Sequence, residues 1–106
     1  MVHRLVVSYG QPDDPAAFDA YYRDTHIPLA TKLPALVRYT LGHPQPLDPS
    51  QPAPYLVAEL DFESAEAMAA GMGSEAGRAA GVDVATFATG GASMASFDLD
   101  DVSPAA

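Results

Sequence analysis

Hydrophobic and polar residues alternate with a period of two along several short segments of the chain. The clearest segment is 55–62, which reads Tyr-Leu-Val-Ala-Glu-Leu-Asp-Phe. One apolar row there (Leu56, Ala58, Leu60, Phe62) alternates with Tyr55, Val57, Glu59 and Asp61. This alternation predicts a half-buried strand. Runs of β-branched and apolar residues predict three more strands, at 3–9, 36–42 and 92–99.

A helical period separates the first two predicted strands. Asp14 followed by Pro15 is a strong helix start, because the carboxylate caps free N–H groups and proline suits the first turn. Residues of one helix face then recur at steps of three or four: Phe18, Tyr22, His26, Leu29 and Leu33. Pro28 predicts a kink or break near Ile27, with a further turn as far as Leu33.

Two serines predict the helices that precede the last strand. Ser64 caps a short Ala/Met helix over 65–70. Ser74 caps another helix that ends near Gly81, and 82–87 predicts a further helical turn.

The resulting order is strand, helix, strand, strand, helix, strand. This order predicts a ferredoxin-like α+β fold, a split βαβ pair in which helices cover one face of a four-stranded antiparallel sheet. Residues 43–54 contain five prolines and predict an extended loop. A chain of 106 residues fits one domain over residues 1–106.

The sheet face without helices is predicted to be apolar. In the first strand Val6 points away from Leu5 and Val7, and the third strand adds Tyr55 and Val57 opposite its main apolar row. Such a patch is larger than a soluble monomer usually exposes. We therefore expect a homodimer in which two sheets face each other and enclose a cavity for a small apolar ligand.

The composition excludes several classes of partner. Fourteen acidic residues against five basic ones give a formal charge of −9, which disfavours nucleic acid and anionic membranes. Cysteine is absent, so disulfides and thiolate sites are excluded. There is neither a membrane-span-sized apolar run nor a signal-peptide pattern, so we expect no membrane association and a cytoplasmic location.

Motifs for cofactors and metals are weak. Residues 71–76 match G-x-G-x-x-A but follow a helix, so helix-end punctuation explains them better than dinucleotide binding. Residues 91–95 lack the second glycine of a nucleophile elbow. The three histidines lack the spacing of metal ligands. We therefore predict neither a cofactor nor a metal.

His26 is the most informative candidate for chemistry. Its helical stripe points it toward the interior, near the break at Pro28. One interpretation is a core histidine satisfied by one hydrogen bond. The other is an acid/base group, because an imidazole titrates near neutral pH.

Tyrosines are the candidate partners of this imidazole, since a phenol can donate to a carbonyl or enolate oxygen. Tyr39 shares strand parity with Val37 and Leu41, which leaves its sheet face open, and Glu59 is either an acid/base partner or a surface carboxylate. The predicted ligand pocket consists of Tyr9, Tyr22, Tyr55, Glu59 and Phe87.

One segment of the chain resembles a known family. Residues 21–30 (Tyr-Tyr-Arg-Asp-Thr-His-Ile-Pro-Leu-Ala), then Lys-Leu-Pro-Ala-Leu at 32–36 and Arg38-Tyr39, resemble the signature of EthD-like proteins in the dimeric α+β barrel superfamily. Residues 8–12 and 83–91 are also similar to it.

The resemblance implies protomers whose sheets pair into a barrel that holds the pockets. Relatives include proteins linked to ether degradation, lactone isomerases, polyketide-type cyclases and small monooxygenases. The matching residues of the lactone isomerases place His26 and Tyr39 in the active site as catalytic residues. A further histidine of those relatives is not matched, since Gln51-Pro52 stands there, and no cysteine follows on the third strand.

Two hypotheses from different classes follow. The first is a small cofactor-independent enzyme of isomerase, cyclase or ether-degradation type, in which His26 moves a proton beside a carbonyl and Tyr39 holds the oxyanion. The second is a non-catalytic protein that binds a small apolar compound or assists a catabolic pathway. Only the first requires the imidazole to lie within hydrogen-bond reach of a second polar group in a pocket.

Overall fold

A computed structural model describes residues 1–103 of the chain. The strands are β1 (His3–Tyr9), β2 (Leu36–Gly42), β3 (Leu56–Phe62) and β4 (Ala92–Asp98). The helices are α1 (Pro15–Tyr21), the π-helix η1 (Tyr22–His26), α2 (Ile27–Ala30), α3 (Ala65–Met72) and α4 (Glu75–Phe87). Each predicted strand is present within one residue of its predicted ends.

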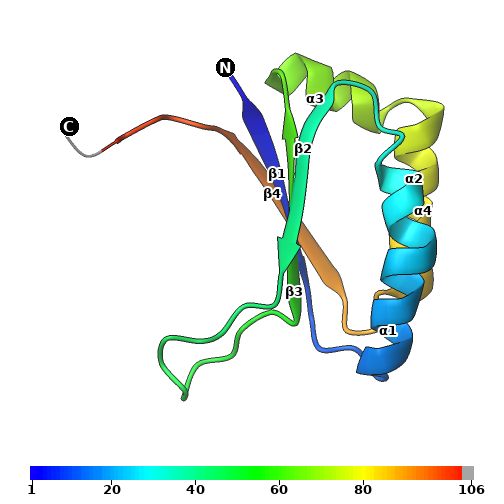
Figure 1. Cartoon of the computed structure of the whole chain (residues 1–106), viewed down its shortest axis with the longest axis vertical. Coiled ribbons are helices and arrows are strands. Elements are labelled where there is room, and N and C mark those ends of the chain that lie inside the picture. Colours follow the sequence, from blue (N-terminus) through cyan, green and yellow to red (C-terminus); the bar gives the residue numbers. More distant parts are fainter. Residues whose placement is uncertain (104–106) are drawn as a thin grey trace.

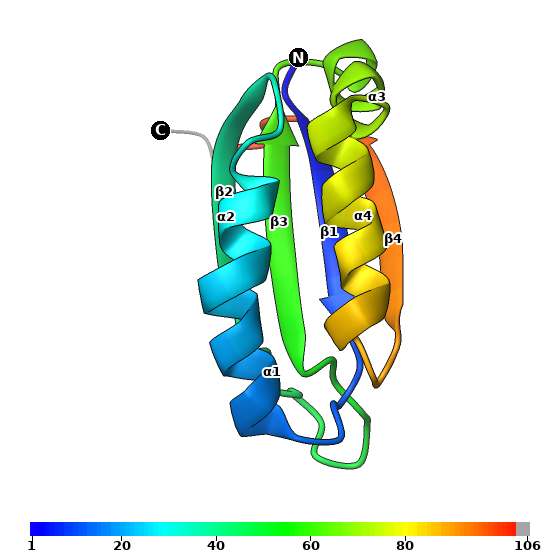
Figure 2. The same cartoon turned by 90° about the vertical axis from the view of Figure 1, so that its right-hand side faces the viewer.

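The four strands form one antiparallel sheet in the order β2-β3-β1-β4. All helices lie on one face of this sheet, and the loop 43–54 projects on the other side (Figure 1). The α1–α2 column lies over the β2–β3 side and α4 toward the β1–β4 side (Figure 2). This arrangement confirms the predicted ferredoxin-like α+β fold.

The helix-covered face holds the core. The buried residues that form it are Leu5, Val7, Tyr9, Phe18, Tyr22, Leu33, Leu56, Ala58, Leu60, Phe62 and Phe87. In β2 the register shifts between Leu36 and Arg38, which leaves Val37 exposed as a bulge. Tyr39 pairs with Leu60 and therefore lies on the helix-covered face, although strand parity alone left its face open.

The first helical column bends into a π-turn before Pro28. Asp14 caps α1 by accepting a hydrogen bond from the Ala17 N–H, as predicted. The Ile27 N–H then donates to the Tyr22 carbonyl, five residues back. Because Pro28 has no N–H to continue the regular ladder, the column widens here instead of stopping.

In the second helical region, one continuous helix replaces the predicted helix and separate turn. Ser64 and Ser74 cap α3 and α4 as expected, but α4 continues past Gly81 to Phe87 as one helix. A Cβ added to Gly77 would lie 2.2 Å from the Gly71 carbonyl oxygen, so these two helices approach too closely for a side chain there. The G-x-G motif therefore serves helix ends and packing.

The uncovered face is more polar than the sequence suggested. Arg4 Nε and Nη2 donate to the two oxygens of Asp61 at 2.7 and 3.0 Å, and Arg4 Nη1 lies 3.5 Å from Glu59 Oε2. Val57 does lie on this face. Tyr55 does not: it precedes β3, so strand alternation does not orient it, and its ring packs edge-on against Phe18 on the helix side.

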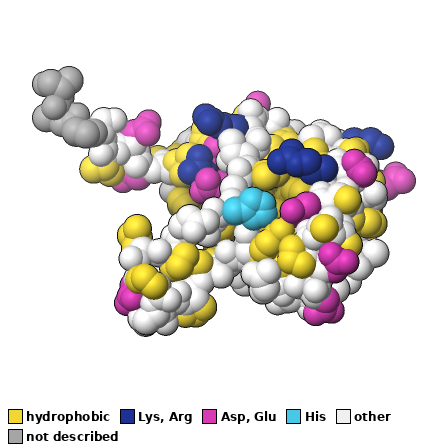
Figure 3. Space-filling view, turned by 60° about the horizontal axis from the view of Figure 1, so that its bottom comes forward, with side chains coloured by type: hydrophobic (Ala, Val, Ile, Leu, Met, Phe, Trp, Pro, Cys, Tyr) yellow, Lys and Arg dark blue, Asp and Glu magenta, His cyan; other side chains and the backbone are white. Residues whose placement is uncertain are grey.

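Acidic residues outnumber basic ones by fourteen to five. Viewed from the end at which loop 43–54 projects, acidic side chains are spread over the helical body and the loop stands out as a separate lobe (Figure 3). Within residues 1–103, the helices are too short or too polar to cross a membrane.

Candidate active site

His26 and Asp83 form a buried pair between two helices. His26 ends η1 and Asp83 lies on α4, 57 residues further along the chain. The imidazole Nδ1 donates to Asp83 Oδ2 at 2.9 Å. The two residues are only 5% and 9% exposed, so little water competes for this bond.

Tyr21 supplies the second hydrogen bond to the Asp83 carboxylate. Its hydroxyl donates to Asp83 Oδ1 at 2.5 Å, so each oxygen of Asp83 accepts one hydrogen bond. The bond to Asp83 raises the pKa of Tyr21, because it favours the protonated phenol. Tyr21, Asp83 and His26 therefore form a continuous polar chain with a fixed direction.

This chain fixes which imidazole nitrogen is free. An ionised carboxylate can only accept hydrogen bonds, so the proton on the imidazole must sit on Nδ1. Nε2 has no partner in the described part of the chain, where every fully buried side-chain nitrogen or oxygen has one. Nε2 therefore keeps a small contact with solvent, and it carries the lone pair whenever the imidazole is neutral.

Aromatic rings surround the imidazole. The ring centroids of Phe87 and Tyr22 lie 4.8 and 5.1 Å from that of His26. Phe87 also packs against Tyr9 and Phe18, at 5.5 and 5.3 Å. This packing holds the imidazole in one orientation and keeps its surroundings apolar.

A buried phenol, Tyr22, and a half-buried one, Tyr39, share a hydrogen bond close to this cluster. The hydroxyl oxygens of Tyr22 and Tyr39 lie 2.6 Å apart. Burial raises the pKa of Tyr22 and of Tyr39, and it raises that of Tyr9 as well. All three phenols therefore stay protonated at neutral pH and are suited to donate hydrogen bonds.

The structure brings together most of the predicted residues, but not all. His26, Tyr9, Tyr22, Tyr39 and Phe87 share the helix-covered side. Tyr55 lies at the edge of this cluster, where its hydroxyl donates to Asp19 Oδ1 at 2.8 Å and its ring touches Phe18.

Glu59 belongs to the opposite side of the sheet. It pairs with Val6 and Thr40 and lies beside Arg4 on the uncovered face. Glu59 and His26 therefore lie on opposite sides of the sheet within one protomer, as the parity of Glu59 predicted, and the place of Glu59 in a ligand pocket stays a prediction. His26 lies among the helices of its own protomer, whereas the predicted cavity between two sheets would lie on the uncovered side.

Sequence reasoning missed Asp83 and the role of Tyr21. Asp83 is one of fourteen acidic residues in the chain. It belongs to no recognisable sequence motif for a catalytic or binding site. The one available signal was a carboxylate among apolar residues in the stretch 82–87, where an acidic side chain has no helix-cap role.

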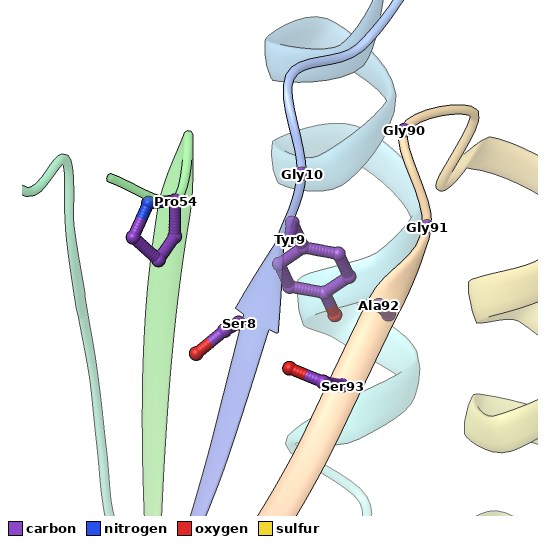
Figure 4. A pocket seen from close by; sticks show the side chains of 8 residues that line it. All are labelled: Ser8, Tyr9, Gly10, Pro54, Gly90, Gly91, Ala92 and Ser93. Atoms are coloured by element: carbon purple, nitrogen blue, oxygen red, sulfur yellow. The ribbon is translucent and has the colours of Figure 1, made fainter. Parts of the chain in front are cut away.

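The hollow at the end of β1 and β4 is less suited to chemistry. It has a volume of about 360 Å³ and is lined by Ser8, Tyr9, Gly10, Pro54, Gly90, Gly91, Ala92 and Ser93. Ser8 and Ser93 lie on neighbouring strands with their hydroxyls on the same side (Figure 4). It contains neither histidine nor carboxylate, so it lacks an acid/base group. Nowhere in residues 1–103 do three or more His, Asp or Glu side chains cluster as a metal site would require.

Comparison with known proteins assigns the family. The EthD domain matches residues 11–91, the stretch that contains His26, Tyr39 and Asp83. The chain belongs to the EthD domain family. A relative from Rhodococcus erythropolis, an uncharacterized 11.0 kDa protein in the thcB-thcC intergenic region, is 38% identical over 103 residues. That match covers 97% of this chain and all of the relative.

Solved structures support the same assignment. An ethyl tert-butyl ether degradation (EthD) family protein from Bacillus halodurans superposes with a TM-score of 0.84 at 28% identity, over 94% of this chain and 100% of that one. A dimeric ferredoxin-like protein of unknown function from Thermobifida fusca gives 0.71 at 17% identity, over 93% and 92%. SnoaB, a cofactor-independent oxygenase from Streptomyces nogalater, gives 0.66 at 16% identity, over 98% and 97%. The last two share the fold with this EthD-domain chain.

Proposed function

We propose that the protein is a small cofactor-independent enzyme that moves a proton at a carbon beside a carbonyl group. The observation that carries this proposal is the bond from His26 Nδ1 to Asp83 Oδ2, which leaves Nε2 as the free base. The Tyr21 hydroxyl on the other oxygen of Asp83 holds the carboxylate in place. A carboxylate that orients a histidine in this way is a common arrangement for general-base catalysis.

The proposed step needs only groups of this chain. Nε2 takes the proton from the carbon next to the carbonyl, and the electron pair of that C–H bond forms the enolate C=C bond. The charge moves to the carbonyl oxygen, which accepts a hydrogen bond from the Tyr22–Tyr39 pair. The imidazolium, stabilised by Asp83, then returns the proton to the same or a neighbouring carbon. Return to a neighbouring carbon gives an isomer, and return to the same carbon gives the substrate with that hydrogen exchanged.

The proposal includes a homodimer and a small apolar ligand. Dimeric proteins of the same fold, such as the Thermobifida fusca protein, support a homodimer. We place its interface at the uncovered sheet face, where Phe97 is 49% exposed. The aromatic surroundings of His26 favour a compact, mostly apolar substrate. Because His26 lies under its own helices, the dimer would support the site rather than form its walls.

An exchange reaction tests this function without knowledge of the natural substrate. Acetophenone in D₂O carries exchangeable protons next to its carbonyl, and NMR measures their replacement by deuterium. We expect exchange above the buffer rate, and His26→Ala and His26→Gln each to lower the protein-dependent rate by about 10²–10⁴-fold. Asp83→Asn should also lower the protein-dependent exchange rate, and Tyr21→Phe should lower it by a smaller factor.

The matched control is His43→Ala, which removes an exposed histidine whose Nδ1 donates to the Tyr55 carbonyl. It should leave exchange unchanged. Exchange that survives both His26 variants, with the fold intact by circular dichroism, would contradict the proposed role of His26.

The second candidate is a non-catalytic binding protein. The close packing of Phe87 and Tyr22 on the imidazole favours it, because it leaves little room beside His26. In that case a ligand should raise the melting temperature, while the protein-dependent exchange rate stays at zero for acetophenone and for related ketones and lactones.

A further inference from the structure

Residues 43–54 form a loop that is held in one shape although it lies outside the core. Five of its twelve residues are proline, and each proline fixes one backbone angle. The Ser50 N–H and hydroxyl donate to Asp48 Oδ1 at 3.0 and 2.8 Å, and the Gln51 N–H donates to the Asp48 carbonyl at 2.9 Å. The loop therefore loses little conformational freedom when another surface binds to it.

Both ends of this loop are anchored in the domain. Before it, Gly42 pairs with Val57 in the sheet. After it, the Tyr55 N–H donates to the Tyr9 carbonyl at 2.8 Å, and the Tyr55 hydroxyl donates to Asp19 Oδ1 at 2.8 Å. The loop therefore projects as a stiff arm, on the side of the sheet that no helix covers (Figure 1).

The arm (residues 43–54) presents an apolar side chain that its own chain does not use. Leu47 is 104% exposed, as open as in an extended peptide. A single exposed leucine is common on soluble proteins. Leu47 differs because it directly precedes the turn at Asp48, in an arm that is already shaped and points beyond the uncovered sheet face.

The uncovered sheet face is small for an interface between two copies. Four strands of seven residues cover about 19 by 23 Å, or roughly 440 Å², at the usual strand spacing and rise. A stable interface buries about 800 Å² on each partner. The proposed homodimer therefore needs contact area beyond the sheet.

Two segments extend from the body on this side and could supply that area (Figure 1). The segment after β4 carries Asp100 and Asp101, whereas the arm carries Asp48 as its one carboxylate. Since the chain has a formal charge of −9, two copies repel each other over most of their surface. The arm is therefore the segment that a second copy can approach with less repulsion.

The sheet face beside the arm is also nearly neutral. Arg4 and Arg38 lie on it, and they balance the two carboxylates there, Asp61 and Glu59. A hollow of about 430 Å³ lies at the foot of the arm, where Gly42, Pro44 and Val57 contribute to its wall. The hollow gives an apolar side chain of another copy a place to pack.

We propose that the arm binds a second copy of this chain, with Leu47 as its anchor and the hollow at the foot of the other copy's arm as its seat. A two-fold pair gives one arm and receives one at each copy, so this contact occurs twice. The inference rests on the homodimer of the proposed function, and it adds the segment that holds the two copies together.

Sedimentation velocity over a dilution series measures the strength of the pair. Leu47→Asp should raise the Kd of the dimer at least about tenfold, because it replaces the anchor by a charge that loses water in the seat. Val82→Asp is the matched control. It adds the same charge at an apolar residue that is 72% exposed on α4, on the helix side, and should leave the Kd unchanged.

A cross-link between copies tests the seat. The chain contains no cysteine, so two introduced thiols report only on their own contact. Leu47→Cys combined with Gly42→Cys should give a covalent dimer on a non-reducing gel, since a disulfide needs Cα atoms within about 7 Å. The control combines Leu47→Cys with Gly81→Cys on α4 and should stay monomeric on the gel. At both glycines a Cβ meets open space, so neither change disturbs the fold.

Two results would overturn the inference alone: a wild-type dimer whose Kd is the same in Leu47→Asp, or equal cross-linking of the two double-cysteine proteins. A wild-type protein that stays monomeric at every concentration would overturn both the arm and the proposed homodimer. A dimer that depends on Leu47 but catalyses no proton exchange would support the arm and overturn the proposed chemistry.

Discussion

The two faces of the sheet use polar side chains in different ways. Under the helices, Tyr21, Asp83 and His26 form one chain with a single nitrogen left free. On the uncovered face, Arg4 satisfies Asp61 with two hydrogen bonds and reaches Glu59 as well. The covered face thus leaves one imidazole nitrogen without a hydrogen-bond partner among the described residues, whereas the uncovered face pairs its arginine with two carboxylates. Both faces carry carboxylates, so what distinguishes the candidate site is that helices cover its side of the sheet.

The largest predicted difference is in the loss of unfolding free energy when one aromatic side chain is removed from each face. Phe87→Ala removes a ring that contacts the imidazole and several phenols, and should lower the free energy of unfolding by about 3–5 kcal/mol in urea titrations. Phe97→Ala on the uncovered face, where the residue is 49% exposed, should cost less than about 1 kcal/mol.

Both variants should be measured at several protein concentrations. A cost of Phe97→Ala that grows with concentration would assign this ring to a contact between copies. A cost as large as that of Phe87→Ala at every concentration would contradict the difference between the faces.

The next prediction concerns the hydrogen bond between Tyr22 and Tyr39 on the covered face. Tyr22→Phe leaves the hydroxyl of half-buried Tyr39 without its partner and should cost about 1–3 kcal/mol of unfolding free energy. Tyr55→Phe is the control, because it removes a hydroxyl that donates to an exposed carboxylate, and should cost less than about 1 kcal/mol. Equal costs would show that burial does not distinguish the two phenols.

The smallest effect tests the uncovered face through its pH dependence. The guanidinium of Arg4 lowers the pKa of Asp61 below its ordinary value. The ionised form is therefore stabilised in the folded state, and this stability is present above the unfolded pKa of about 3.9 and is lost as pH falls through the lower folded pKa. Asp61→Asn should cost about 1–2 kcal/mol at pH 7.

Wild type and Asp61→Asn should become equally stable in strong acid, once the carboxyl of Asp61 is protonated in the folded state. Urea titrations over a series of pH values measure this. A difference between the two proteins that stays constant down to the lowest pH would remove the ion pair as its cause.

Much of the fold was predictable because it depends on local patterns. The alternation in 55–62, the cap at Asp14 and the serines before α3 and α4 all predicted elements that the structure contains. The end of α4 was not predictable from Gly81. That residue has a low helix propensity, but the packing of α4 on the sheet keeps the helix intact beyond it.

The candidate site was only half predictable. The helical stripe placed His26 in the interior, and the structure confirms that burial. Its partner Asp83 could not be found, because contacts across 57 residues leave no periodic signal. The face of Tyr39 was hidden by the bulge at Val37, which changes strand parity without any marker in the residues.

The central claim is that Asp83 holds the proton on Nδ1 of His26 and leaves Nε2 free. Long-range ¹H–¹⁵N NMR of the histidine rings reports the tautomer of the neutral imidazole directly. We expect His26 to be protonated at Nδ1, with this preference reduced in Asp83→Asn. A neutral His26 that carries its proton on Nε2 in the wild-type protein would contradict the account.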